Sequence, residues 1–165
     1  MRGRPPKSEI REKITAILEK LGCSYGYEIY KHYKEIFNDA TSRVVYYHLK
    51  KGVETGEFIN IDVREVDGIY SWGDKSERVY YTLGPFAETR DKWSSKVRIE
   101  TQKREIEYNW EKEVNRKINH IKNLISQNYN KQQILKKIDK LLEWASKLNI
   151  NKELISKINE LKKTL

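Results

Sequence analysis

The stretch from Ser24 to Phe58 constrains the fold most strongly, because its pattern predicts two short helices joined by a tight turn. Ser24 can cap the first helix, whose apolar residues recur at helical spacing: Ile29, Tyr33, Ile36 and Phe37. Asn38-Asp39-Ala40 supplies the turn, and Thr41 can cap a second helix over residues 41–55. This order of elements predicts a helix-turn-helix.

The second helix has two chemically different faces. Val45, Leu49 and Val53 fall at i, i+4 and i+8, so we expect them to form one buried stripe that ends at Gly56. The opposite, exposed face holds Ser42, Arg43, Tyr47, Lys50 and Lys51. Such a face suits a DNA major groove, where the first turn reads base edges and the lysines meet phosphates. It is equally typical of a solvated amphipathic helix.

The flanking segments complete a larger motif. Residues 8–21 predict a preceding helix with an apolar inner face and a stop at Gly22. Residues 57–66 and 77–83 alternate with period two and are rich in branched side chains, which predicts a β-hairpin with its tip over residues 67–76. The order helix, helix, recognition helix, hairpin is that of a winged helix-turn-helix, a mainly α fold with a small β-hairpin.

Several short motifs resemble one family of winged-helix proteins. They are Gly26-Tyr27-Glu28-Ile29, Val45-Tyr46-x-x-Leu49, Gly56, and Arg78-Val79-Tyr80-Tyr81-Thr82-Leu83. Together they look like the DNA-binding domain of PadR-type transcriptional regulators, over residues 8–84. The sequence departs from that pattern at Gly52, where a leucine is usual. The resemblance implies a homodimeric DNA-binding regulator whose C-terminal helices dimerise.

Residues 1–7 form a basic arm with its own signal. Arg2-Gly3-Arg4-Pro5 resembles the core of an AT-hook, and Lys7 adds a third positive charge. Glycine and proline keep such a peptide extended and narrow, so its arginines can enter an A·T-rich minor groove. The alternative is an idle tail.

Charge is unevenly distributed along the 165 residues. The chain carries 33 basic and 24 acidic side chains, a net charge of +9, yet residues 1–84 hold 14 basic and 13 acidic ones. The winged helix is therefore nearly neutral, and DNA affinity would need help from the arm, from dimerisation or from the C-terminal helices. In the wing, we expect Lys75 and Arg78 to contact the DNA backbone. A single cysteine and the lack of a long apolar run favour a cytoplasmic, nucleoid-associated protein without a membrane segment.

Residues 85–165 are predicted to be a helical dimerisation region. After Pro85 the chain contains neither glycine nor proline, so a first long helix is expected from about Phe86 or Glu88 to Ser126, followed by two more. Its coiled-coil-like seam comprises Trp110, Val114, Ile118, Ile121 and Ile125. Three such apolar stripes cannot all be buried against an 84-residue domain, and pairing of two chains would solve this.

The sequence gives little sign of catalysis. Its three histidines lie on different predicted helices, and no metal-ligand spacing, phosphate loop or nucleophile motif is present, so we expect no cofactor and no enzyme. A small-molecule effector among the tryptophans is possible but unsupported, since core and dimer packing explains these aromatic residues better. Three functions remain in competition: a dimeric transcriptional regulator that binds double-stranded DNA, an architectural chromatin-like DNA-binding protein, and a winged-helix protein-interaction module.

Overall fold

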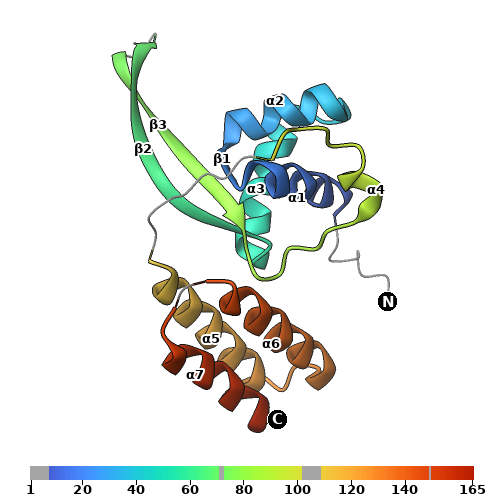
Figure 1. Cartoon of the computed structure of the whole chain (residues 1–165), viewed down its shortest axis with the longest axis vertical. Coiled ribbons are helices and arrows are strands. Elements are labelled where there is room, and N and C mark those ends of the chain that lie inside the picture. The colour runs from blue at the N-terminus through green and yellow to red at the C-terminus, as the bar shows by residue number, and fades with distance from the viewer. Residues whose placement is uncertain (1–7, 71–72, 102–108, 149) are drawn as a thin grey trace. The chain divides into compact units, whose positions relative to one another are not determined.

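The helices and strands follow the order of a winged helix, with additional helices after it (Figure 1). The computed structural model describes residues 8–70, 73–101, 109–148 and 150–165, with the backbone alone described over 62–70 and 73–77. The chain divides into two compact units, residues 1–106 and 107–165. The segment after the wing belongs to the first unit, which therefore extends beyond the expected boundary at residue 84.

Three helices form the core of the first unit: α1 (Glu9–Leu21), α2 (Gly26–Ile36) and α3 (Ser42–Thr55). Their predicted ends are confirmed at several points. The Thr41 hydroxyl accepts a hydrogen bond from the Val44 amide, and Gly56 ends α3 with a φ of 81°. The core between the helices contains Ile14, Ile17, Leu18, Leu21, Ile29, Tyr33, Val45, Leu49 and Phe58, all fully buried.

A short strand precedes α2 where the sequence predicted a helix cap. Strand β1 (Cys23–Tyr25) pairs with β3 (Gly73–Leu83), with Ser24 opposite Tyr81. The expectation that Ser24 caps the helix is wrong, because Tyr25 is the N-cap of α2 and makes no capping hydrogen bond through its side chain. Local capping rules cannot anticipate this strand, because its partner lies far along the chain.

The wing is longer than expected. Strands β2 (Phe58–Tyr70) and β3 pair antiparallel from Phe58 opposite Leu83 to Tyr70 opposite Gly73, in a sheet ordered β1-β3-β2. Most of the predicted tip over residues 67–76 therefore lies within the strands, with register shifts near Asn60 and Asp67. Figure 1 shows this hairpin as a twisted ribbon that reaches beyond the helices of its unit.

The segment after the wing is mostly non-helical, so the long helix expected to begin at Phe86 or Glu88 is wrong. It contains one turn of helix, α4 (Asp91–Ser94), and packs on the first unit through the buried residues Phe86, Trp93 and Val97. The Trp93 indole donates a hydrogen bond to the Glu12 carboxylate over 3.1 Å. Burial of these apolar side chains outweighs the local helical preference of the segment.

The second unit is a three-helix bundle of α5 (Trp110–Ser126), α6 (Lys131–Ser146) and α7 (Lys152–Lys163). Each helix begins with an asparagine whose side chain accepts backbone hydrogen bonds, namely Asn109, Asn130 and Asn151. Its core comprises Val114, Ile118, Ile121, Ile134, Ile138, Leu141, Ala145, Leu154, Ile158 and Leu161.

This bundle changes the interpretation of the predicted dimerisation seam. Val114, Ile118 and Ile121 are at most 3% exposed, because α6 and α7 of the same chain cover them. Trp110 and Ile125 are only half-buried. The argument that the seam needs a second chain is therefore wrong for its three central residues: each amphipathic helix buries its stripe against the other two.

Candidate nucleic-acid interface

Helix α3 presents the predicted polar face to solvent. Ser42, Arg43, Tyr47, Lys50 and Lys51 are all exposed, while Val45 and Leu49 on the opposite face are fully buried. The helix has no acidic residue in its first turn. The N-terminal end of the helix dipole and the Arg43 side chain therefore both place positive charge at the exposed start of α3.

The two lysines near the end of α3 differ in their surroundings. The Lys51 ammonium lies 3.4 Å from the Glu54 carboxylate in an exposed i,i+3 pair. Lys50, one residue earlier, is also exposed. Such surface pairs contribute little, roughly 0 to 1 kcal/mol, so a phosphate can replace Glu54 at low cost.

A polar cluster fixes the turn before α3. The Lys13 ammonium, which is almost completely buried on α1, donates to the Asp39 carboxylate, and the Tyr33 hydroxyl donates to the same group over 2.6 Å. Burial alone would raise the pKa of Asp39, but these two hydrogen bonds outweigh it and leave the pKa below 3.8. The Phe37 and Trp93 rings lie 5.1 and 4.6 Å from the same ammonium. The turn before α3 is thus held by α1 and α2, and Trp93 of α4 packs against the Lys13 ammonium.

The first turn of α1 holds the outer edge of α3. His48 of α3 lies with its Nδ1 atom 3.4 Å from the Ser8 hydroxyl and 3.3 Å from the Arg11 guanidinium. Arg11 also donates to the Glu57 carboxylate over 2.9 Å. These polar contacts join His48 of α3 to the first turn of α1.

The aromatic ring of Tyr46 connects α3 to the start of α2. The Tyr46 ring packs directly on Gly26, where a β-carbon would overlap ring atom Cε1. The pKa of the Tyr46 hydroxyl is raised, mainly by burial and to a smaller extent by the neighbouring Tyr27 and Tyr25. This contact explains why glycine and tyrosine occur together in the Gly26 and Tyr46 motifs: the ring needs the space that a side chain would fill.

Among the wing residues predicted to contact DNA, Arg78 can be placed. Its guanidinium lies 4.2 Å from the centre of the Tyr25 ring, a cation–π contact that positions it beside β1. The side chain of Lys75 lies outside the described residues, as do Arg2, Arg4 and Lys7 of the arm.

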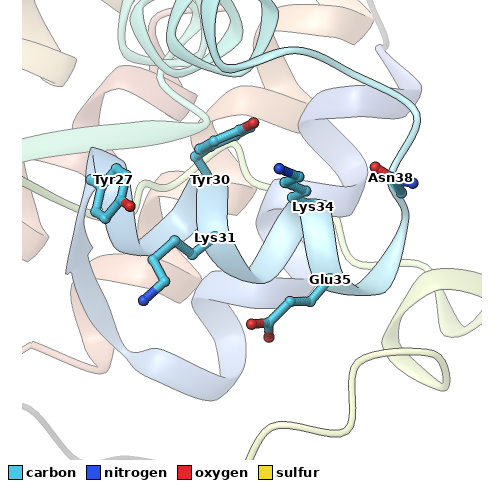
Figure 2. Close-up of a pocket in the computed structure, with 6 residues that line it drawn as sticks. All are labelled: Tyr27, Tyr30, Lys31, Lys34, Glu35 and Asn38. Atoms are coloured by element: carbon cyan, nitrogen blue, oxygen red, sulfur yellow. The ribbon is translucent and has the colours of Figure 1, made fainter.

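Helix α2 contributes a surface that the sequence reasoning missed. A shallow hollow of about 450 Å³ follows its outer side, lined by Tyr27, Tyr30, Lys31, Lys34, Glu35 and Asn38. Figure 2 shows Tyr30 and Lys34 projecting to one side of the helix and Lys31 and Glu35 to the other. The signal was present in the sequence, because polar and aromatic residues repeat at i and i+4 opposite the buried Ile29 and Tyr33.

Acidic side chains of α1 are engaged by the segment after the wing. Glu12 binds Arg90 over 3.0 Å, and Glu19 accepts hydrogen bonds from Thr89 and Ser94. Two of the 13 acidic side chains of residues 1–84, Glu12 and Glu19, are therefore committed to contacts within the first unit, and α3 itself contains a single acid, Glu54.

Among the residues that the structure describes, no group of three or more histidines, cysteines or carboxylates is arranged to hold a metal ion. None of the described helices combines the length and the apolar composition that a membrane crossing requires.

The fold defines the class of protein: the first unit is a winged helix-turn-helix. No protein-family model matches the chain, and no curated protein matches it. Among solved structures, it is similar to Bacillus subtilis PadR, whose crystal structure was determined in complex with operator DNA. That similarity covers 98% of this chain and 100% of the PadR chain, at 15% sequence identity and a TM-score of 0.37.

Proposed function

We propose that the protein binds double-stranded DNA as a transcriptional regulator, with α3 in the major groove and the wing, residues 58–83, along the backbone. The observation that carries this proposal is the exposed face of α3, which comprises Ser42, Arg43, Tyr47 and Lys50. The turn before this helix is fixed by the ion pair between Lys13 and Asp39. An exposed helix with arginine in its first turns matches the geometry that reads base edges.

Helix α2 supports the same arrangement. In a helix-turn-helix the first helix of the motif crosses the phosphate backbone while the second enters the groove. Lys31 and Lys34 are both exposed along the hollow of α2, which Tyr27 and Tyr30 also line. These are the side chains that phosphate oxygens accept hydrogen bonds from.

Two finer parts of the proposal concern symmetry and the arm. We propose that two chains act together on a palindromic site, since paired recognition helices would double the readout. We also propose that Arg2 and Arg4 enter an A·T-rich minor groove beside that site.

A binding titration tests the proposal. The full chain is titrated by fluorescence anisotropy against random duplexes and duplexes from its own promoter region, across salt concentrations. Arg43→Ala should cost about 1 to 3 kcal/mol and relax preference at one base pair, while Lys50→Ala should weaken all sequences alike and lower the salt slope by about one. Lys152→Ala, outside the winged helix, is the control with the same change of charge.

The outcomes separate the competing functions. Site preference that depends on Arg43 supports the regulator, whereas uniform, salt-sensitive binding supports an architectural protein. Absence of DNA binding would contradict both and leave the protein-interaction module.

A further inference from the structure

The C-terminal bundle has a strongly unequal distribution of charge. Its described residues, 109–148 and 150–165, include 13 basic and 6 acidic side chains. The apolar stripes of the three helices are buried in the bundle core. Packing therefore accounts for the apolar residues of this unit but not for the positive charge on its surface.

Helices α5 and α6 run antiparallel and bring their basic residues together. The Trp110 and Trp144 rings meet with 5.9 Å between their centres, so the start of α5 lies beside the end of α6. About two to three turns further on, His120 of α5 lies close enough to Lys117, and to Lys137 of α6, for their ammonium groups to add to the effect of burial and lower its pKa. Positive charges from both helices thus meet across one seam.

The acids near this seam are few and already engaged. Glu113, only 7% exposed, lies 3.3 Å from the Arg116 guanidinium and 3.6 Å from the Lys117 ammonium. Asp139 belongs to the other side of α6, where Lys162 of α7 binds it over 2.8 Å. A buried carboxylate shared by two cations fixes their positions without reversing the sign of the surface.

At about 100° per residue, most of the charged residues of α5 and α6 fall on one face that the two helices share. The face that α5 and α6 share, which we term the α5–α6 face, comprises Lys112, Arg116, Lys117, His120, Lys136, Lys137, Lys140 and Lys147, with Glu113 and Glu143. The outer side of α7 instead mixes Lys152, Lys157 and Lys163 with Glu153 and Glu160. The excess positive charge is therefore concentrated on one side of the bundle.

We propose that the α5–α6 face binds the phosphate backbone of double-stranded DNA as a second contact, in addition to α3. Helix α6 has 16 residues, which at 1.5 Å each span about 24 Å. Over that length duplex DNA presents about 14 phosphate charges, at one per 1.7 Å of axis, so the face and the duplex match in extent and sign. The inference rests on the proposed function for its partner, because tethering to a DNA-bound winged helix raises the local DNA concentration at the bundle.

The experiment compares two triple variants of the full chain that lose the same charge. One changes the face, Lys136→Gln, Lys137→Gln and Lys140→Gln; the other changes α7, Lys152→Gln, Lys157→Gln and Lys163→Gln. Binding to a long duplex is measured by anisotropy across salt concentrations, after circular dichroism shows that both variants retain their helices. The face variant should lower the salt slope by roughly 2 to 3, and the α7 variant by less than one.

A second variant guards against a folding defect in α6. Lys112→Gln with Arg116→Gln changes exposed positions on α5, and it should lower the salt slope by roughly 2. Equal losses in the face and α7 variants, or no loss in either, would overturn the inference. So would loss of binding to phosphatidylcholine–phosphatidylserine vesicles with unchanged DNA binding, because the face would then serve a membrane surface.

Failure of this inference is distinguishable from failure of the proposed function. If Arg43→Ala weakens binding and the face variant does not, the bundle contact is wrong and the winged-helix contact stands. If the face variant weakens binding and Arg43→Ala with Lys50→Ala does not, the bundle binds DNA by itself and the proposed role of α3 is wrong.

Discussion

Replacing Gly52 by alanine tests how α3 is seated on the sheet. Gly52 lies inside α3, where alanine would ordinarily stabilise the helix by about 1 kcal/mol. Here an added β-carbon would overlap atoms Cδ2 and Cε2 of the Phe58 ring and lie 3.0 Å from Cγ. Phe58 is fully buried at the start of β2, so its ring cannot turn aside into solvent. Two opposing effects therefore act on one substitution.

The magnitudes decide between them. Forcing an extra methyl group into a packed core costs about 1 to 3 kcal/mol, and overlap with two atoms of a buried ring belongs at the upper end. After the gain of about 1 kcal/mol in helix propensity, we expect Gly52→Ala to lower the free energy of unfolding by about 2 kcal/mol. The midpoint of thermal unfolding of this unit should fall by roughly 8 to 16 °C, measured by calorimetry.

Shortening the opposing side chain provides the control. Phe58→Leu alone should cost about 1 to 2 kcal/mol, less than the 3 to 5 of a truncation to alanine. The double variant should be more stable than the sum of the two single effects, with a coupling of about 1 to 3 kcal/mol. If Gly52→Ala stabilises the protein, or if the two effects simply add, the ring does not lie on Gly52 and the described seat of α3 is wrong.

Four further predictions concern pH, the arm and assembly. Asp39→Asn should lower the free energy of unfolding by about 1 to 3 kcal/mol near neutral pH, since Lys13 loses a partner. Because the folded pKa of Asp39 lies below 3.8, its contribution to stability is present above that pH and lost below it. Acid unfolding followed by circular dichroism should therefore be less steep in the variant. The pKa of His120 is lowered below 6.5 by burial and, to a smaller extent, by Lys137 and Lys117, so the unfolded chain binds that proton more readily than the folded chain. The free energy of unfolding should therefore fall as pH drops below 6.5. His120→Gln should remove this part of the decline, measured by urea titration at each pH. Deleting residues 2–7 should weaken binding most on A·T-rich flanks, and an equal loss on G·C-rich flanks would mean that the arm supplies charge only. Light scattering should give twice the chain mass of 19.7 kDa, and the single mass would contradict the dimer.

The helix-turn-helix could be predicted because its determinants are local. Thr41 and Gly56 bound α3 by their own backbone and side-chain chemistry, and the Val45 and Leu49 stripe needs only helical periodicity. The exposure of Arg43 and Tyr47 follows from the same periodicity, so the candidate face of α3 was accessible from the sequence. Gly52 was visible only as an irregularity, because its reason is the Phe58 ring beyond the end of the helix.

The failures share a different cause, which is competition from distant partners. Ser24 has the chemistry of a helix cap, but pairing of β1 with β3 places it in a strand. The residues around Trp93 have no helix breaker, but α1 offers them a buried surface, and its Glu12 carboxylate accepts a hydrogen bond from the Trp93 indole. Val114 and Ile118 indicated a seam correctly, yet periodicity cannot say whether the covering helix comes from the same chain.

The placement of charge matters more for DNA binding than its total. A net charge of nearly zero over residues 1–84 argued that the winged helix would bind DNA weakly, but that sum does not say where each charge lies. Glu12, Glu19 and Glu57 are engaged by Arg90, by the hydroxyls of the segment after the wing, and by Arg11. Because salt screens exposed charges beyond about 8 Å at physiological ionic strength, a bound phosphate senses mainly the groups next to it. The α3 face and the α5–α6 face should therefore contribute to the measured salt slope according to their own cations, and their two reductions should add in a combined variant.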